Sequence, residues 1–114
     1  MRDALRHNGI DCLLPATPGR DTGWCLALVE PSGERTFVTA PGAESAQDAS
    51  SLAAIVLRPG DAVYLSGYDL VYPDAAPALT TWLAALPPAA DDGPWVVFDP
   101  GPLVGQIAGQ WLRS

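Results

Sequence analysis

The fold is decided by residues 22–44, which read TGWCLALVEPSGERTFVTAPGAE. This stretch predicts two strands joined by a tight turn, because Pro31 presets φ at the second turn position and Gly33 is favoured at the fourth position of a type I turn. In the first strand, bulky side chains alternate with smaller ones: Trp24, Leu26 and Leu28 against Cys25, Ala27 and Val29. Neither side of this first strand carries a charge. We therefore expect one face to lie on protein and the other to cover a ligand or partner that binds and dissociates.

Two further segments follow this hairpin in the chain. SGYDL lies at residues 66–70 and FDPGP at residues 98–102. Together with TG before an apolar strand and SGERTFVTAPGAE at residues 32–44, these segments resemble the PfkB/ribokinase-type carbohydrate kinases, in which the hairpin is a lid. Three segments in the expected order are more specific than any one of them.

The resemblance implies an α/β fold, a partial ribokinase-like three-layer sandwich of parallel strands and helices with an antiparallel β-hairpin lid. It makes residues 1–114 a partial PfkB-like kinase domain. The lid region would cover about residues 11–44, and the α/β portion about residues 50–114.

Composition places the chain among globular proteins. Its 114 residues suit one small domain, and 48% are hydrophobic while 17% are charged. The net charge is −7 and all six basic residues are arginine, which argues against a nucleic-acid partner because phosphate contacts need clustered basic residues. No apolar run reaches the ~20 residues that span a bilayer, so we expect no membrane association.

Compartment is suggested by two observations. Arg2, Asp3, Arg6 and His7 interrupt any apolar N-terminal run, so we expect no signal segment. Cys12 and Cys25 have neither zinc-site nor disulfide-framework spacing, and we predict two buried thiols in a reducing compartment. A cytoplasmic protein follows.

The remaining elements alternate between strand and helix. We predict the end of a helix at 1–8, strands at 10–14, 62–66 and 95–98, and helices from Ser50 or Ser51 to about 57, at 73–86 and at 103–112. We expect both later strands to be buried on both faces. We expect apolar side chains to point inward from the last two helices: Leu79, Trp82, Leu83 and Leu86, then Val104, Ile107 and Trp111. Strand–helix alternation argues for a parallel sheet in an α/β layer fold.

Candidate ligand positions follow the two later strands, because open α/β sheets bind ligands outside the carboxyl ends of their strands. Asp99 is either a ligand contact or a cap for the final helix. Tyr68 either packs or binds, and Asp69 is expected to be solvated or capping. Other catalytic motifs are missing from the sequence: it contains no GxxxxGK[ST] and no HExxH, and His7 is its one histidine.

The resemblance assigns substrate roles by position. In the family the lid closes over the sugar, and Cys25, Ala27, Phe37 and Thr39 match its inward positions. Tyr68 lies near a position that contacts the sugar in some members and is acidic in others. With Asp99, these residues form the candidate substrate-binding set. The alternative for the hairpin residues is packing within the hairpin or against a second subunit, since lids of this family often pair into a dimer interface.

The resemblance also implies parts that these residues do not contain. The family's N-terminal sugar-binding segment would lie upstream, and its C-terminal GAGD motif and nucleotide site downstream. We therefore expect the central fragment of an ATP-dependent sugar or nucleoside kinase, inactive alone, with no catalytic residue or cofactor of its own. ATP and Mg²⁺ are implied for the full-length family. The alternatives are a lid-mediated binding or oligomerisation module without catalysis, and an unrelated small α/β domain.

Overall fold

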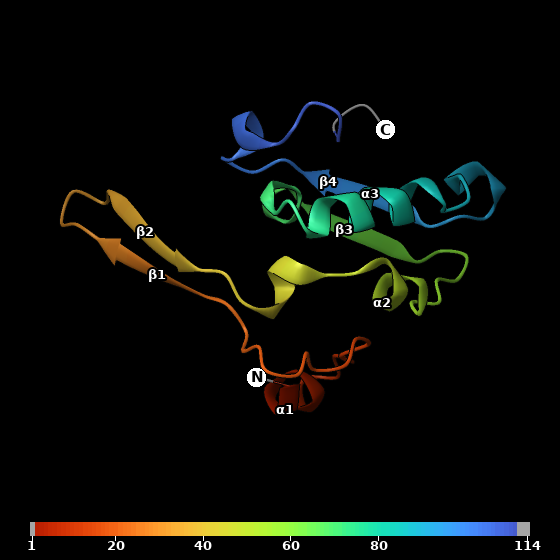
Figure 1. Cartoon of the computed structure of the whole chain (residues 1–114), viewed down its shortest axis with the longest axis horizontal. Coiled ribbons are helices and arrows are strands. Elements are labelled where there is room, and N and C mark those ends of the chain that lie inside the picture. Colours follow the sequence, from red (N-terminus) through yellow and green to blue (C-terminus); the bar gives the residue numbers. More distant parts are fainter. Residues whose placement is uncertain (1, 112–114) are drawn as a thin grey trace.

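The structure is a computed structural model, and it describes residues 2–111. A hairpin of two strands projects away from an α/β part (Figure 1). The helices and strands are α1 (Arg2–His7), β1 (Trp24–Val29), β2 (Arg35–Ala40), α2 (Ala49–Ala53), β3 (Ala62–Ser66), α3 (Ala75–Ala84) and β4 (Trp95–Asp99). Four short 3₁₀ helices join them: η1 (Ala43–Ala46), η2 (Gly67–Val71), η3 (Ala89–Asp91) and η4 (Val104–Gln106).

The predicted hairpin is confirmed. β1 and β2 pair antiparallel, with Val29 opposite Arg35 next to the turn. The Gly33 N–H donates to the Glu30 carbonyl at 2.9 Å, and the Glu30 N–H donates to the Glu34 carbonyl at 2.9 Å. Gly33 has φ +88°, in the left-handed region where glycine has no steric penalty. This is the pattern of a three-residue loop that ends in a glycine bulge.

Both faces of the hairpin are exposed. One face carries Cys25, Ala27, Val29, Arg35, Phe37 and Thr39, and the other carries Trp24, Leu26, Leu28, Thr36, Val38 and Ala40. The Phe37 side of the hairpin is as open as the Trp24 side, since these two residues are 60% and 59% exposed. The order of the hairpin therefore depends on its own pairing and on its base.

The α/β part is built on a parallel pair of strands, as predicted. Ala62 lies opposite Trp95 and Ser66 opposite Asp99, so both strands end at the same edge. α3 connects them and lies on one face of the pair, where its Leu79 and Leu83 pack against the core cluster that contains Leu65 of β3 (Figure 1). The core consists of Leu65, Leu70, Ala76 and Ile107, with Val71, Leu79, Leu83 and Trp111 partly buried against it.

The prediction that both parallel strands are buried on both faces is wrong. Every residue of β4 is exposed, and in β3 the only buried residue is Leu65. Tyr64 and Val97, which are paired in the register, point to the side away from the core and are 65% and 52% exposed. A two-stranded sheet with one helix on it has only one face covered.

Two predicted elements do not form. Residues 10–14 contain no strand, and the Ile10 N–H instead donates to the Leu5 carbonyl at 3.0 Å. The predicted helix at 103–112 is limited to the 3₁₀ turn Val104–Gln106, and Leu112 lies outside the described residues. Gly105 and Gly109 explain the loss, because glycine disfavours a helix interior. Ile107 is nevertheless buried, as predicted, while Val104 is exposed.

The other helices differ from prediction mainly at their ends. The N-cap of α2 is Asp48 rather than Ser50 or Ser51, because its carboxylate accepts the Ser50 hydroxyl at 2.6 Å and the Ser51 N–H at 2.8 Å. These bonds, the Ser50 one first, lower the pKa of Asp48. α2 ends at Ala53 rather than near Leu57. Across residues 2–111, none of the helices has both the length and the apolar character needed to cross a membrane.

We predict that the core around Leu65 supports the stability of the α/β part. Leu65→Ala should lower the free energy of unfolding by about 2–5 kcal/mol, because it removes buried contacts and leaves a cavity. Val97→Ala, on the uncovered face, should cost less than about 1 kcal/mol. Urea unfolding followed by circular dichroism measures both, and an equal loss at the two positions would contradict the core assignment.

Candidate functional site

Four of the candidate substrate residues share one face of the hairpin. Cys25 lies opposite Thr39, and Ala27 lies opposite Phe37. The Thr39 hydroxyl donates to the Cys25 sulfur at 3.4 Å, which ties the two strands together on this face. We call these four residues the inner face of the hairpin. It offers one aromatic ring, one hydroxyl, one thiol and one methyl group to whatever lies against it.

The two cysteines are free thiols. The prediction that both are buried is wrong, because Cys12 is half-buried and Cys25 is exposed. Cys25 is exposed because it lies on the inner face, which no part of the described chain covers.

The other candidates, Tyr68 and Asp99, lie at the carboxyl edge of the parallel strands. Asp99 accepts two hydrogen bonds at 2.9 Å, one from the Tyr64 hydroxyl and one from the Gly101 N–H. The bond from Tyr64 to the carboxylate raises the pKa of Tyr64. Asp99 does not cap the final helix, since the residue before η4 is Leu103 and makes no side-chain cap. Its carboxylate instead holds the turn that follows β4.

The loops after β3 and β4 meet at this edge. Gly67 packs so closely on Pro100 that a Cβ there would overlap the Pro100 carbonyl oxygen. A Cβ on Gly101 would lie 3.5 Å from Tyr68 Cε2. The edge therefore brings Tyr68 and Asp99 into one region, as the rule for open sheets predicts. Within residues 2–111, no hydrogen bond or ion pair joins them to the inner face of the hairpin.

The base of the hairpin contains a residue to which sequence analysis assigned no role. Glu44 accepts the Gly23 N–H at 2.9 Å and the Gly42 N–H at 2.7 Å, one on each carboxylate oxygen. These bonds, the Gly42 one first, lower the pKa of Glu44. The signal was present in the sequence as a glycine before the first strand, a glycine after the second and a carboxylate two residues later.

Asp69 is half-buried rather than freely solvated, and its carboxylate is hydrogen-bonded by the backbone of Ser66, the N-cap of η2, so the capping alternative agrees with the structure. Burial raises the pKa of Asp69, the backbone of Ser66 opposes this by hydrogen bonding, and the negative charge of Glu44 raises the pKa further. Both η1, which contains Glu44, and η2, which contains Asp69, pack against α3.

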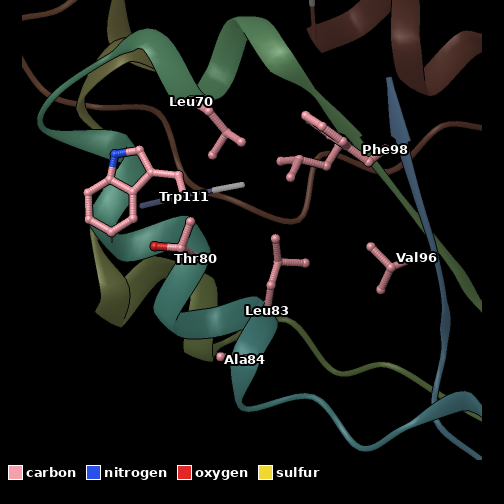
Figure 2. Close-up of a pocket in the computed structure, with 8 residues that line it drawn as sticks. Leu70, Thr80, Leu83, Ala84, Val96, Phe98 and Trp111 are labelled. Carbon is pink, nitrogen blue, oxygen red and sulfur yellow. The ribbon is translucent and has the colours of Figure 1, made fainter. Parts of the chain in front are cut away.

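An apolar cavity of about 430 Å³ lies between α3 and β4 (Figure 2). Its lining residues are Leu65, Leu70, Thr80, Leu83, Ala84, Val96, Phe98 and Trp111. The Thr80 hydroxyl already donates within α3, to the Ala76 carbonyl at 2.8 Å. The cavity is therefore a packing space on the α3 side of the sheet, and it does not suit a ligand rich in hydroxyl groups.

Neither the sequence nor the described residues 2–111 contain a recognisable motif for a nucleotide or a metal ion. The sequence has no lysine and no phosphate-binding loop of the GxxxxGK[ST] type. The part of the chain that the structure describes has no group of three or more His, Cys, Asp or Glu side chains placed to hold a metal ion. No step of a reaction through ATP or Mg²⁺ is therefore assigned to these side chains.

Comparison with known proteins agrees with the resemblance. Residues 1–100 match the model of the pfkB family of carbohydrate kinases. The chain is also similar to YegV, an uncharacterized sugar kinase of Escherichia coli (strain K12), with 39% identity over 107 residues. The match covers 94% of this chain and 31% of YegV, so the chain spans about a third of that relative. No solved structure matches the chain.

The family match covers most of the chain, and it agrees with the observed antiparallel hairpin and parallel strand pair. The chain belongs to the pfkB family of carbohydrate kinases.

Proposed function

We propose that this chain is the central part of an ATP-dependent sugar or nucleoside kinase. The region at about residues 11–44 supplies a lid over the substrate, and the region at about residues 50–114 supplies part of the sugar pocket. One observation carries the proposal: the register of the hairpin gathers Cys25, Ala27, Phe37 and Thr39 on a single face. Membership of the family supports it.

The chemistry of the inner face suits a hydroxylated ring. Cys25 and Ala27 are small, so a ring can come close to the backbone of β1. The Phe37 ring offers an apolar surface for the C–H face of a sugar. The Thr39 hydroxyl retains acceptor capacity for a sugar hydroxyl, because it uses its proton on Cys25.

The strand-end residues extend this pocket in the proposal. Tyr68 is 47% exposed, so its hydroxyl is available to a ligand. Each oxygen of Asp99 already accepts one hydrogen bond, and each has a second lone pair for a sugar hydroxyl. The lid would have to close toward the carboxyl edge for both sets to contact one sugar.

The task of such a lid is to orient the accepting hydroxyl and exclude water. Phosphoryl transfer depends on positioning and on charge stabilisation more than on covalent chemistry by the protein. A base for the hydroxyl proton and donors for the phosphate are also needed, and these residues supply neither. We place the reaction in the cytoplasm, because free thiols are typical of a reducing compartment.

We predict that the 114-residue chain alone does not phosphorylate sugars. An ATP-consumption assay with pentoses, hexoses and nucleosides should show no turnover above the rate without protein, because the base and the phosphate donors are missing. Clear turnover with any of these substrates would contradict the proposal that the chain is only the lid and part of the pocket.

We predict weak sugar binding on the inner face. In NMR titrations with the same compounds, backbone amide shifts should change at Ala27 and Phe37. Phe37→Ala should weaken the effect about tenfold, because it removes the largest apolar surface of that face. Val38→Ala, on the opposite face of the same strand, is the matched control and should leave binding within about twofold. Equal effects of the two variants would contradict an inner-face site.

A second candidate function, association through the hairpin, is favoured by the exposed residues opposite the inner face. Trp24, Leu26 and Leu28 are 59%, 51% and 50% exposed. A contiguous apolar strip of this kind is typical of a surface that pairs with another protein. It is compatible with the lid function, since the two functions use opposite faces.

We predict that self-association depends on this strip. Leu26→Glu should weaken dimerisation about tenfold or more, because it places a charge in an apolar contact. Ala27→Glu adds the same charge on the inner face and should change dimerisation less than about twofold. Sedimentation at several concentrations measures both, and a chain that stays monomeric throughout would count against the association.

A further inference from the structure

We infer that Glu44 is a positioning residue: its carboxylate joins the two arms of the hairpin at their base and sets the angle at which the hairpin projects from the α/β part. The use of that angle, to place the inner face over a sugar, rests on the proposed function. The geometric claim itself needs no substrate, and it is tested without one.

The hydrogen bonds at the base reach both arms. Gly23 immediately precedes β1 and Gly42 follows β2, and their N–H groups point at the two oxygens of the same carboxylate, at 2.9 and 2.7 Å. A further bond crosses the base, from the Ala43 N–H to the Asp21 carbonyl at 2.8 Å. Hydrogen bonds to an ionised acceptor are about twice as strong as neutral ones, so this carboxylate is the strongest link at the base.

Glycine is required on each arm for the link to form. A Cβ on Gly23 would overlap the Glu44 Oε1 and lie 2.8 Å from the Gly42 nitrogen. A Cβ on Gly42 would overlap the Gly23 nitrogen. Both positions are therefore closed to side chains, and the two backbones come close enough for a single carboxylate to span them.

The same residue connects the hairpin to the rest of the chain. Glu44 lies in η1, and η1 packs against α3. Ser45 fixes the start of η1, because its N–H and its hydroxyl both donate to the Gly42 carbonyl, at 3.2 and 2.8 Å. Beyond this base, β1 and β2 project into solvent (Figure 1). Glu44 is thus the point where the direction of the hairpin is set.

Arg2 and Asp48 line the same pocket as Glu44, and two further titratable groups act on it from the side of η2. Asp69 and Tyr72, on or next to η2, interact with it electrostatically, and both have raised pKa values, chiefly through burial. The Asp21 carboxylate is near in the chain, but it accepts the Thr22 N–H at 2.8 Å. Among residues 2–111, the side-chain acceptor for the N–H groups of both Gly23 and Gly42 is Glu44.

The first test measures amide hydrogen exchange of the full 114-residue chain by NMR. Glu44→Gln keeps one acceptor oxygen and loses the other, so exchange at Gly23 or Gly42 should rise about tenfold to a hundredfold. Glu34→Gln is the matched control: it removes the same charge at the other end of the hairpin, and both glycines should stay within about twofold. Equal effects of the two variants would overturn the inference.

The second test uses the unaltered chain, so it decides the question even where Glu44→Gln fails to fold. The amide proton shifts of Gly23 and Gly42 should titrate together, with one midpoint below the ordinary pKa of glutamate. That midpoint should match the Glu44 carboxyl carbon. Two different midpoints, or a midpoint shared with Asp21 or Asp69 instead, would overturn the inference.

The same titration reports the angle of the hairpin. Because the folded pKa of Glu44 is lowered, the link is complete above the unfolded pKa and is lost as pH falls through the folded pKa. Residual dipolar couplings of β1 and β2 should fit one common orientation with α3 at neutral pH, and should average out below the midpoint. Couplings that keep their orientation after Glu44 is protonated would overturn the positioning role.

These outcomes separate the two proposals. Failure to bind sugar on the inner face would remove the proposed lid function and leave the Glu44 result standing. Failure of the exchange and titration tests would remove the positioning role and leave sugar binding by the inner face untouched.

Discussion

The hairpin depends on a close backbone approach between Gly23 and Gly42 with no side chain between them. Two N–H groups at that crossing would otherwise lack strong acceptors, and one carboxylate satisfies both. A two-stranded hairpin is marginally stable in water by itself. Here every strand residue except the half-buried Ala40 is exposed, so the order of the hairpin comes from its turn, its pairing and this base.

What the sequence predicted well was local. The turn at Pro31–Gly33 follows from the backbone preferences of two residues, and the register of β1 on β2 follows from the turn. Because side chains alternate between the two faces of a strand, this register then places Cys25, Ala27, Phe37 and Thr39 on one face. The parallel pair β3–β4 was likewise predictable from two short apolar runs separated by a helical one.

The features that the sequence did not predict depend on contacts with other elements or on competition between nearby residues for one position. Residues 10–14 have a strand-like pattern, but a strand exists only where another strand pairs with it. Burial of β4 depends on which elements pack on the two faces of the sheet, and the composition of Trp95–Asp99 does not determine this. At the start of α2, Asp48, Ser50 and Ser51 can each serve as a cap, and Asp48 takes the position with its ionised carboxylate. The role of Glu44 links residues that lie 21 positions apart, beyond the reach of local rules.

Each hairpin strand has six residues, which makes it about 20 Å long. If Gly23 and Gly42 are taken as the pivot, a rotation there displaces the turn more than any other part of the hairpin. A tilt of about 10° at that pivot moves the turn by about 3.5 Å over this length, roughly the difference between a hydrogen bond and a gap that admits water. Sub-ångström changes in one carboxylate contact are thereby amplified at the tip. Residues at the base can accordingly govern where the far end of the hairpin lies.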